Sequence, residues 1–227
     1  MILAATGLGR ERRIVAGPGV EAIAGGGDHQ RLEKLLEARA GDARGIISIG
    51  IAGGLAPDLR PGRWVVADTV LIDGRRIASD SSWTERLAAH LSGAARGALL
   101  GVDAIVTESR DKAELHLRTG AQAVDMESHV VARVALRHRL PFDAARVICD
   151  PAHRALPAAA RVALKADGQT NVRAVLRSLL AQPSQLPALI VTAVDAERSF
   201  RSLLRGHRRL GPGLCGPDFR ELPLDVP

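Results

Sequence analysis

The chain has 227 residues, of which 46% are hydrophobic and 25% are charged, so it is long enough to bury one sizeable core. This composition excludes a disordered or fibrous protein. The formal net charge of +6, carried almost entirely by arginine, would suit an anionic partner, but the chain has only two Trp, three Phe and no Tyr. Because readers of single-stranded nucleic acid stack bases on aromatic side chains, we expect no nucleic-acid partner.

The sequence also indicates the cellular compartment of the protein and whether it binds a metal ion. No apolar segment approaches the roughly 18 residues of a membrane span, and the apolar start of the chain is too short for a secretory signal. Two cysteines, Cys149 and Cys215, cannot build a disulfide framework or a four-thiolate metal site. The seven histidines lack metal-ligand spacing. We therefore expect a cytoplasmic protein without a metal ion or a bound cofactor.

Short apolar segments alternate with longer amphipathic ones along the chain, a pattern typical of α/β domains. Several apolar segments are uninterrupted, as expected for a sheet that is covered on both faces. Strands are predicted over residues 2–5, 45–51, 64–72, 99–106, 121–126 and 144–149. Helices are predicted over residues 29–39, 84–95, 111–118, 127–139 and 171–181, and residues 80–82 supply capping residues for the second of them.

A proline-rich break over residues 182–187 predicts the end of the core domain, which divides the chain into residues 1–185 and residues 186–227. The second part begins with a long amphipathic helix to about residue 208 and continues as a tail rich in Gly and Pro. Its arginines could rest on anionic lipid headgroups, or they could be solvated residues of a helix packed on the core. These residues are Arg198, Arg201, Arg205, Arg208 and Arg209.

Three segments place small or acidic residues at the predicted carboxyl end of a strand, where ligands bind in α/β folds. The first is the glycine-rich sequence of residues 48–55. Around Ala52 and Gly53 its backbone N–H groups could approach an anion or a sugar closely, because no side chain intervenes. A plain turn would use the same glycines.

The other two segments carry acids. Asp125, Met126 and Glu127 lie where a strand passes into a helix, and a carboxylate there could bind a vicinal diol or simply cap the helix. Cys149 and Asp150 end an apolar strand before a proline. Burial would raise the pKa of Asp150 and allow it to deliver a proton, whereas an ordinary turn aspartate is the alternative.

The order and spacing of these motifs resemble the nucleoside phosphorylase and methylthioadenosine/S-adenosylhomocysteine nucleosidase superfamily. The resemblance covers roughly residues 1–180 and rests on Ile-Ala-Gly-Gly-Leu, Gly-Arg-Trp-Val-Val-Ala-Asp, Val-Asp-Met-Glu and Ile-Cys-Asp. The short N-terminal half, residues 150–154 and the extended C-terminal helix look most like the branch associated with hopanoid biosynthesis. The resemblance implies a single three-layer phosphorylase/hydrolase-like α/β domain with a mixed central β-sheet flanked by helices.

The resemblance also implies a reaction and its residues. The reaction is cleavage of an N-glycosidic bond through a transition state with positive charge on the ribose. Glu127, with Asp125 beside it, would bind the ribose hydroxyls, and Met126 would lie against the sugar or the base. Asp150 would protonate, or hydrogen-bond to, N7 of the departing adenine. Glu11 would orient an attacking water.

The sequence departs from the family pattern at two positions. Ile51 stands where the family usually has a Ser or Thr that contacts water or phosphate. Cys149 stands where nucleosidases commonly have a Ser that aligns the acid. If phosphate is a co-substrate, the candidates to bind it are in the N-terminal loop, although these arginines could equally be ordinary surface residues. The candidates are Gly9, Arg10 and Arg13. The candidates for stacking on the base are Trp83 and Phe142.

The leading hypothesis is an enzyme that releases adenine from a nucleoside with a bulky 5′ group, adenosylhopane being the substrate that the resemblance implies, by phosphorolysis or hydrolysis. A methylthioadenosine/S-adenosylhomocysteine nucleosidase is the alternative within the same class. A non-catalytic nucleoside-binding module, motivated by Ile51, is the alternative in another class. As partners we expect a small-molecule nucleoside, a second copy of the chain in a homodimer or larger assembly, and peripheral contact with a membrane.

Overall fold

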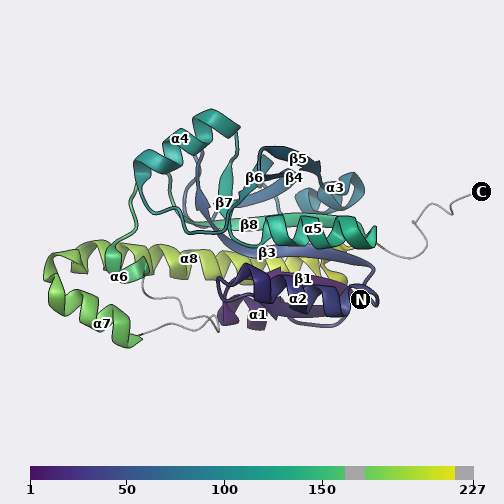
Figure 1. Ribbon diagram of the computed structural model, residues 1–227, viewed down its shortest axis with the longest axis horizontal. Coiled ribbons are helices and arrows are strands. Elements are labelled where there is room, and N and C mark those ends of the chain that lie inside the picture. The colour runs from purple at the N-terminus through teal and green to yellow at the C-terminus, as the bar shows by residue number, and fades with distance from the viewer. Residues whose placement is uncertain (162–171, 218–227) are drawn as a thin grey trace, which may run out of the picture.

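The apolar segments of the sequence form an eight-stranded mixed sheet in the computed structural model, which describes residues 1–161 and 172–217 (Figure 1). The strands are β1 (Ile2–Thr6), β2 (Val20–Ala24), β3 (Gly45–Gly54), β4 (Trp64–Ile72), β5 (Arg75–Ala78), β6 (Ala95–Gly101), β7 (Ala123–Asp125) and β8 (Phe142–Asp150). The helices are α1 (Gly9–Val15), α2 (His29–Ala40), α3 (Ser81–His90), α4 (Ser109–Thr119), α5 (Ser128–His138), α6 (Ala158–Arg161), α7 (Val172–Ala181) and α8 (Leu186–Leu210). Two short 3-10 helices are η1 (Pro183–Gln185) and η2 (Pro212–Cys215).

The sheet closes on itself in its central part. The strand order is β2-β1-β3-β7-β6-β4-β5, and β8 pairs with both β3 and β4. Strands β3, β7, β6, β4 and β8 therefore form a ring. Within it β7 is antiparallel to β3 but parallel to β6, and β8 is parallel to β3 but antiparallel to β4. The carboxyl ends of β3 and β8 consequently lie side by side, and the three-residue strand β7 pairs with Gly53 and Gly54 at the end of β3.

Helices cover both faces of the sheet. Helices α2 and α5 pack on one face, and α1, α3 and α8 pack on the other. Along β1 the side chains alternate between the two cores, since Leu3 belongs to the first and Ile2 to the second. This arrangement confirms the predicted three-layer α/β domain with a mixed sheet.

Most predicted elements are confirmed within a few residues, and the errors have local causes. The predicted helix over residues 84–95 is α3, which starts earlier, with Asp80 accepting a hydrogen bond from Trp83 N, and ends at His90. Gly93, with φ of +76°, then turns the chain into β6. The strand predicted over residues 99–106 was therefore displaced, because β6 begins at Ala95 and the chain leaves the sheet after Gly101.

Several elements were not predicted. These are α1, β2, β5 and α6, which are short and lack a strong apolar pattern. The strand predicted over residues 121–126 shortens to β7, so it does not extend through Met126 and Glu127. Of the predicted C-terminal tail, residues 212–215 form η2, and residues 218–227 lie outside the described part. Residue 171, the predicted start of α7, also lies outside it.

The long helix α8 has two different halves. Its C-terminal half packs on β8, where Phe200, Leu203 and Leu210 enter the same core as Trp64 and Val147. Its N-terminal half extends beyond the sheet together with α7 (Figure 1). The predicted division of the chain at residue 185 coincides with η1 and stays a prediction about domain organisation. Among the helices of the described residues, none combines the length and the hydrophobicity needed to cross a membrane.

Candidate active site

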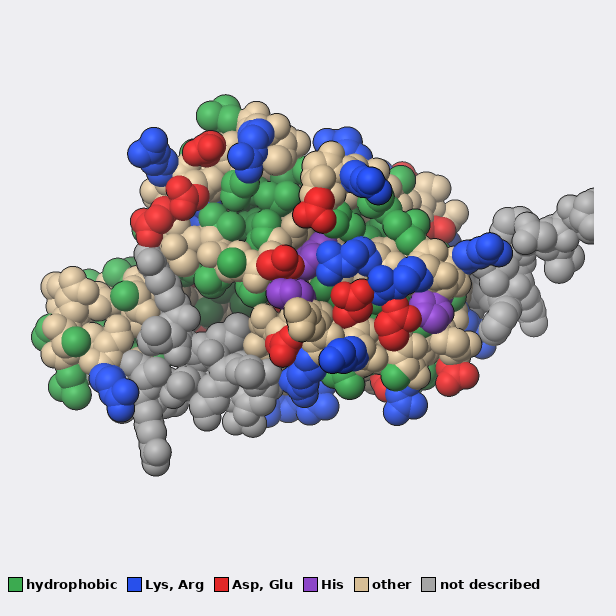
Figure 2. All heavy atoms as spheres, in the orientation of Figure 1, with side chains coloured by type: hydrophobic (Ala, Val, Ile, Leu, Met, Phe, Trp, Pro, Cys, Tyr) green, Lys and Arg blue, Asp and Glu red, His purple; other side chains and the backbone are tan. Residues whose placement is uncertain are grey.

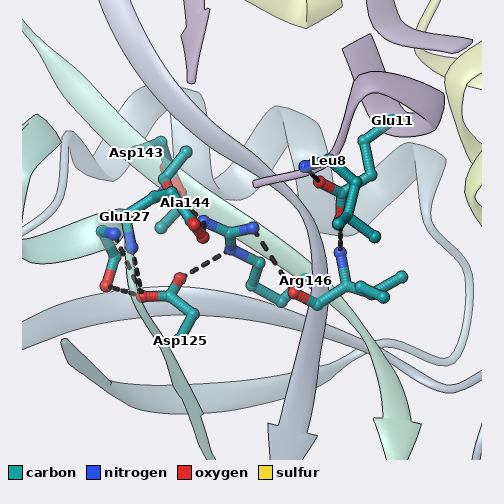
Figure 3. Close-up of polar contacts among 10 residues, drawn as sticks. Leu8, Glu11, Asp125, Glu127, Asp143, Ala144 and Arg146 are labelled. Carbon is teal, nitrogen blue, oxygen red and sulfur yellow. Dashed lines mark hydrogen bonds and ion pairs between the residues drawn. The ribbon is translucent and has the colours of Figure 1, made fainter. Parts of the chain in front are cut away.

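A buried arginine on β8, Arg146, is surrounded by carboxylates near the place where β3, β7 and β8 end (Figure 3). Its Nε lies 2.6 Å from Asp125 Oδ2, and its Nη2 lies 3.0 Å from Glu127 Oε2. It also donates hydrogen bonds to Ser48 Oγ and, at 3.4 Å, to the carbonyl oxygen of Ile51. Because a buried charge without a partner costs several kcal/mol, the cation and the acids hold one another in place.

The third acid, Glu11, comes from the first turn of α1 and is fixed by backbone groups. Its Oε2 accepts a hydrogen bond from Leu8 N, and its Oε1 accepts one from Ile51 N, both at 2.6 Å. A Cβ atom at Gly50 would lie 2.5 Å from Glu11 Oε1, so only glycine admits the carboxylate there. A Cβ atom at Gly7 would lie 2.9 Å from an oxygen of Glu127 and 3.4 Å from one of Glu11. The carboxylates of Glu11 and Glu127 therefore face each other across Gly7.

Burial changes the acidity of this cluster. Desolvation raises the pKa of Glu11, although the Arg146 guanidinium opposes the shift. Desolvation also raises the pKa of Glu127 to about 7, again against Arg146, and the neighbouring charges of Asp125 and Glu11 raise it further. Glu127 can consequently gain and lose a proton near neutral pH.

Asp125 has two contacts at once. Its Oδ1 accepts hydrogen bonds from Ser128 N at 3.0 Å and from Ser128 Oγ at 2.6 Å, so it caps α5, while its Oδ2 pairs with Arg146. Glu127 occupies the N-cap position but makes no capping hydrogen bond with its side chain. The capping interpretation therefore applies to Asp125, and Glu127 is left to face Arg146 and Gly7.

Asp150 ends β8 beside the glycine-rich end of β3. A Cβ atom at Gly53 would lie 3.4 and 3.5 Å from its two carboxylate oxygens. Burial raises the pKa of Asp150, and the ammonium of Lys112, which forms an ion pair with Asp150 Oδ2, opposes this. The side chain of Asp150 is 16% exposed, so it is largely shielded from solvent but not fully buried.

The remaining predicted residues lie around these acids. Ala52 is buried in β3 next to Gly53, and Met126 is partly exposed between Asp125 and Glu127. Cys149 precedes Asp150, and burial raises the pKa of its thiol to about 12, which keeps it neutral. Among the described residues, no group of three or more His, Cys, Asp and Glu side chains is placed to hold a metal ion.

The predicted phosphate residues are not brought to the acids. Gly9 begins α1, and Arg13 is exposed. Arg10 points to α8 instead, with its Nη2 at 2.8 Å from Glu197 Oε2 and its guanidinium 4.1 Å from the centre of the Phe200 ring. Phosphate binding by these three residues stays a prediction, and the cation that contacts the acids is Arg146.

The two candidates for stacking on adenine lie at the other end of the strands. Trp83 is fully buried, donates its Nε1 hydrogen to Leu214 O at 2.9 Å, and lies against Gly45 at the start of β3. Phe142 starts β8, whereas Asp150 ends it. Neither can reach a ligand at Asp150, so this expectation was wrong.

Sequence reasoning missed the two cations of the site. Arg146 stands alone in the otherwise apolar middle of a predicted strand, and that was a usable signal for a buried charge with a function or a partner. Lys112 gave no such signal, because the predicted helix around it is rich in charged residues.

Comparisons with known proteins agree with this fold. Residues 26–182 match the family model described as the phosphorylase superfamily. Helicobacter pylori 5′-methylthioadenosine/S-adenosyl homocysteine nucleosidase is 14% identical with a TM-score of 0.62, covering 92% of this chain and 95% of that one. Streptococcus pneumoniae MTA/SAH nucleosidase in complex with 8-aminoadenine is 13% identical with a TM-score of 0.62, and the match covers 92% of this chain and 98% of that one. A futalosine hydrolase mutant of Helicobacter pylori is 17% identical with a TM-score of 0.54, and the match covers 65% of this chain and 88% of that one. No sequence among curated proteins matches the chain.

Proposed function

The chain belongs to the phosphorylase superfamily, and on this basis we propose that it is an enzyme that cleaves the N-glycosidic bond of an adenine nucleoside and releases adenine. The observation that carries the proposal is the placement of three buried acids along the second half of β3, with Glu11 at Gly50 and Ile51, Glu127 beside it at Gly7, and Asp150 at Gly53. Each has a raised pKa through burial, as expected for groups that exchange protons in a reaction.

Asp150 supplies the proton of the leaving group. When the bond between C1′ and N9 breaks, its electron pair moves into the base, and N7 takes the proton of the Asp150 carboxyl group. The acid is left as a carboxylate. Its raised pKa favours the protonated form before the step, and its partial exposure gives the base access to it.

Glu127 and Glu11 act on the sugar side. The carboxylate of Glu127 accepts hydrogen bonds from the ribose hydroxyls, and its negative charge stabilises the positive charge that develops on the ring. Glu11 accepts a proton from the water that adds to C1′, which yields the free sugar. Arg146 holds Glu127 in place for this task.

We propose water as the acceptor, in preference to phosphate. The Ile51 N–H group is occupied by Glu11, and Arg146 already faces Asp125 and Glu127. Three carboxylates around one guanidinium would repel a phosphate dianion. Arg10, one of the two arginines next to Glu11 in the sequence, forms an ion pair with Glu197.

The substrate proposal is an adenine nucleoside with a bulky apolar 5′ group, adenosylhopane in hopanoid biosynthesis being the compound that the sequence resemblance implies. Methylthioadenosine or S-adenosylhomocysteine is the second candidate, since solved structures of similar fold are nucleosidases for these compounds. A panel of adenosines with 5′ groups from methylthio to long alkyl, assayed for adenine by chromatography with and without phosphate, tests all of these points.

Hydrolysis predicts a rate of adenine release that is independent of phosphate, and the leading substrate predicts a preference for the longest apolar 5′ groups. Faster release from methylthioadenosine would select the second candidate. Absence of adenine release from every compound would reject the enzymatic proposal and favour a non-catalytic nucleoside-binding module.

We also propose that α8 rests on a membrane surface. Residues spaced three or four apart lie on one face of a helix, and one such face of α8 is exposed along its whole length. Its first part is apolar and its second part is cationic. The apolar residues are Ile190, Val191 and Val194, which are 44–56% exposed, and the cationic ones are Arg198, Arg201, Arg205 and Arg208. Figure 2 shows hydrophobic side chains on the tip that α7 and the start of α8 form.

A straight face that changes from apolar to cationic suits a bilayer with anionic headgroups, since apolar side chains enter the interface and arginines bind phosphates.

Flotation with phosphatidylglycerol vesicles tests whether α8 binds such a membrane. We expect binding at low salt, loss of binding to pure phosphatidylcholine, and weaker binding of Arg201→Glu. Lys34→Glu, an equal charge change on exposed α2 at the opposite face of the sheet, is the matched control. Equal binding of both variants would contradict the proposal.

A further inference from the structure

Lys112 is a buried lysine with a complete set of partners. It lies on α4, and its side chain is 0% exposed. Besides its ion pair with Asp150 Oδ2, its Nζ donates to Pro151 O at 3.2 Å and to Arg154 O at 2.9 Å. An ammonium group has three N–H donors, so none remains free for a substrate. Lys112 therefore binds the protein itself, at the carboxylate and at the loop that follows it.

Lys112 is also the cation that contacts Asp150. Among the described residues, Arg154 is a second cation whose charge acts on this carboxyl, and it pairs with Asp195 at 2.5 Å between Nη1 and Oδ2. The neighbouring thiol of Cys149 is neutral. Ser199, on the facing part of α8, donates its hydroxyl to backbone oxygens of Ile148 and Asp195. Neither side chain orients the carboxylate.

We propose that Lys112 is the positioning residue of Asp150, holding the carboxyl group toward the leaving base and stabilising the carboxylate that remains after proton transfer. The inference rests on the proposed function. In the transfer, the O–H bond of Asp150 breaks and an N7–H bond forms, while the ammonium of Lys112 keeps all of its protons. The negative charge left on Asp150 is then paired with Lys112, which makes the transfer more favourable.

Lys112 also sets how strong an acid Asp150 is. Burial raises the pKa of Asp150, and the positive charge of Lys112 lowers it again. A general acid works only in its protonated form, so activity falls as the pH rises through this pKa. Without the charge of Lys112 the pKa moves up, and the fall in activity moves to higher pH.

The test compares Lys112→Gln, which keeps a hydrogen-bond donor but loses the charge, with Lys112→Arg, which keeps the charge. The first measurement is a ¹³C NMR pH titration of the Asp150 carboxyl in substrate-free protein, assigned with Asp150→Asn. We expect Lys112→Gln to raise the titration midpoint by about 1 unit or more, the usual scale for losing a contacting opposite charge. The midpoint of Lys112→Arg should stay within about half a unit of the wild-type value. Unchanged titration in Lys112→Gln would overturn the proposal.

The second measurement is the dependence of kcat on pH. We expect the fall of kcat at high pH, the descending limb of this profile, to move to higher pH in Lys112→Gln and to stay in place in Lys112→Arg. A similar loss of kcat in both variants without movement of the limb would make Lys112 merely structural and overturn the inference. If the wild-type protein releases no adenine, the proposed function fails, whereas the NMR titration still decides whether Lys112 controls the charge of Asp150. If Lys112→Gln does not fold, Lys112→Met, which also removes the charge, takes its place in both measurements, and an unchanged titration midpoint of Asp150 in that variant would equally overturn the proposal.

Discussion

At the scale of single residues, the site buries several acids around a single cation, Arg146. Arg146 faces Asp125 and Glu127 directly and Glu11 at longer range. Such a cluster is costly to bury, because each charge loses its hydration. This loss of hydration raises the pKa values of Glu11 and Glu127, and the Arg146 guanidinium opposes the shift. In the proposed reaction both acids act as carboxylates, and the positive charge of Arg146 favours that ionised form.

Replacing the acid tests the role of Asp150. We expect Asp150→Asn to reduce kcat roughly a hundredfold or more, the usual scale for general acid catalysis, with a much smaller change in KM. The amide has nearly the same shape but cannot deliver the proton. Adenine release measured by chromatography checks this, with Asp58→Asn, an exposed aspartate, as the control. A kcat that is unchanged in Asp150→Asn would contradict the assigned role.

The raised pKa of Glu127 also predicts how stability depends on pH. Its pKa is about 7 in the folded chain against 4.5 as the ordinary value. Between these values the folded state holds a proton that the unfolded state has lost, so stability falls as the pH rises through this window. At about 1.4 kcal/mol for each pKa unit, the change is on the order of 3 kcal/mol.

Urea denaturation at several pH values between 4.5 and 7 measures this dependence. Glu127→Gln should make the decline shallower by the contribution of this one group, because an amide does not titrate, while Glu11 and Asp150, whose pKa values are also raised, keep their own contributions. Glu114→Gln, on the exposed side of α4, should leave it unchanged. An equally steep decline in the Glu127→Gln protein would show that another group is responsible.

At the scale of elements, α8 is both part of the core and an extension from it. Leu203 is fully buried against the sheet, whereas its neighbour Leu204 is 37% exposed. We expect Leu203→Ala to lower the free energy of unfolding by about 2–5 kcal/mol, because it leaves a cavity. Leu204→Ala, the same change one residue along the helix, should cost less than about 1 kcal/mol. Equal losses in urea denaturation would mean that α8 does not pack as described.

The helices and strands also show where the apolar pattern of the sequence predicts an element correctly and where it does not. The strand over residues 64–72 and the helix over residues 127–139 were predicted almost to the residue, because the first is a mostly continuous apolar segment and the second has apolar residues at helical spacing. β6 was displaced, since its first residues Ala95, Arg96 and Gly97 carry no apolar pattern. They join the sheet only because β4 provides partners for them.

At the scale of the whole molecule, two of the surfaces that expose large apolar side chains are candidates for contacts with other molecules. One is the outward face of α8, which we assign to lipid. The other includes Ile105 and Leu117, 52% and 86% exposed, on the loop after β6 and on α4. Isolated exposure of large apolar groups is common, but these two lie on segments that border one cleft, lined by Ile105 and Leu115. We propose this second surface as the contact between two copies of the chain.

The expected mass in analytical ultracentrifugation is therefore twice 24.0 kDa. Leu117→Asp, which buries a charge in the contact, should shift the protein toward monomers. Val194→Asp, on the outward face of α8, should keep the dimer but weaken vesicle binding, so each variant is the control of the other. A monomeric wild-type protein, or a dimer lost equally in both variants, would contradict the assignment of the two surfaces.

The sequence by itself determined the α/β class, most strands and helices, and the motifs that end in Asp125, Glu127 and Asp150. These follow from local patterns, since the period of apolar residues and the residues at strand ends are properties of neighbouring positions. The family resemblance added roles for these acids and for Glu11. It supplied no partner for the charges of Glu127 or Asp150.

Only the tertiary structure decided which cations meet these acids. Arg146 and Ser48 are 98 positions apart, and Lys112 and Asp150 are 38 apart, yet each pair is in contact. Arg10 and Arg13 are closer in sequence to Glu11, but Arg10 pairs with Glu197 and Arg13 is exposed. The contacts exist because β8 pairs with both β3 and β4 and so closes the ring of strands, which brings distant strand ends and α4 to one place. Such long-range pairing leaves no periodic trace in the sequence, and therefore only the folded chain reveals it.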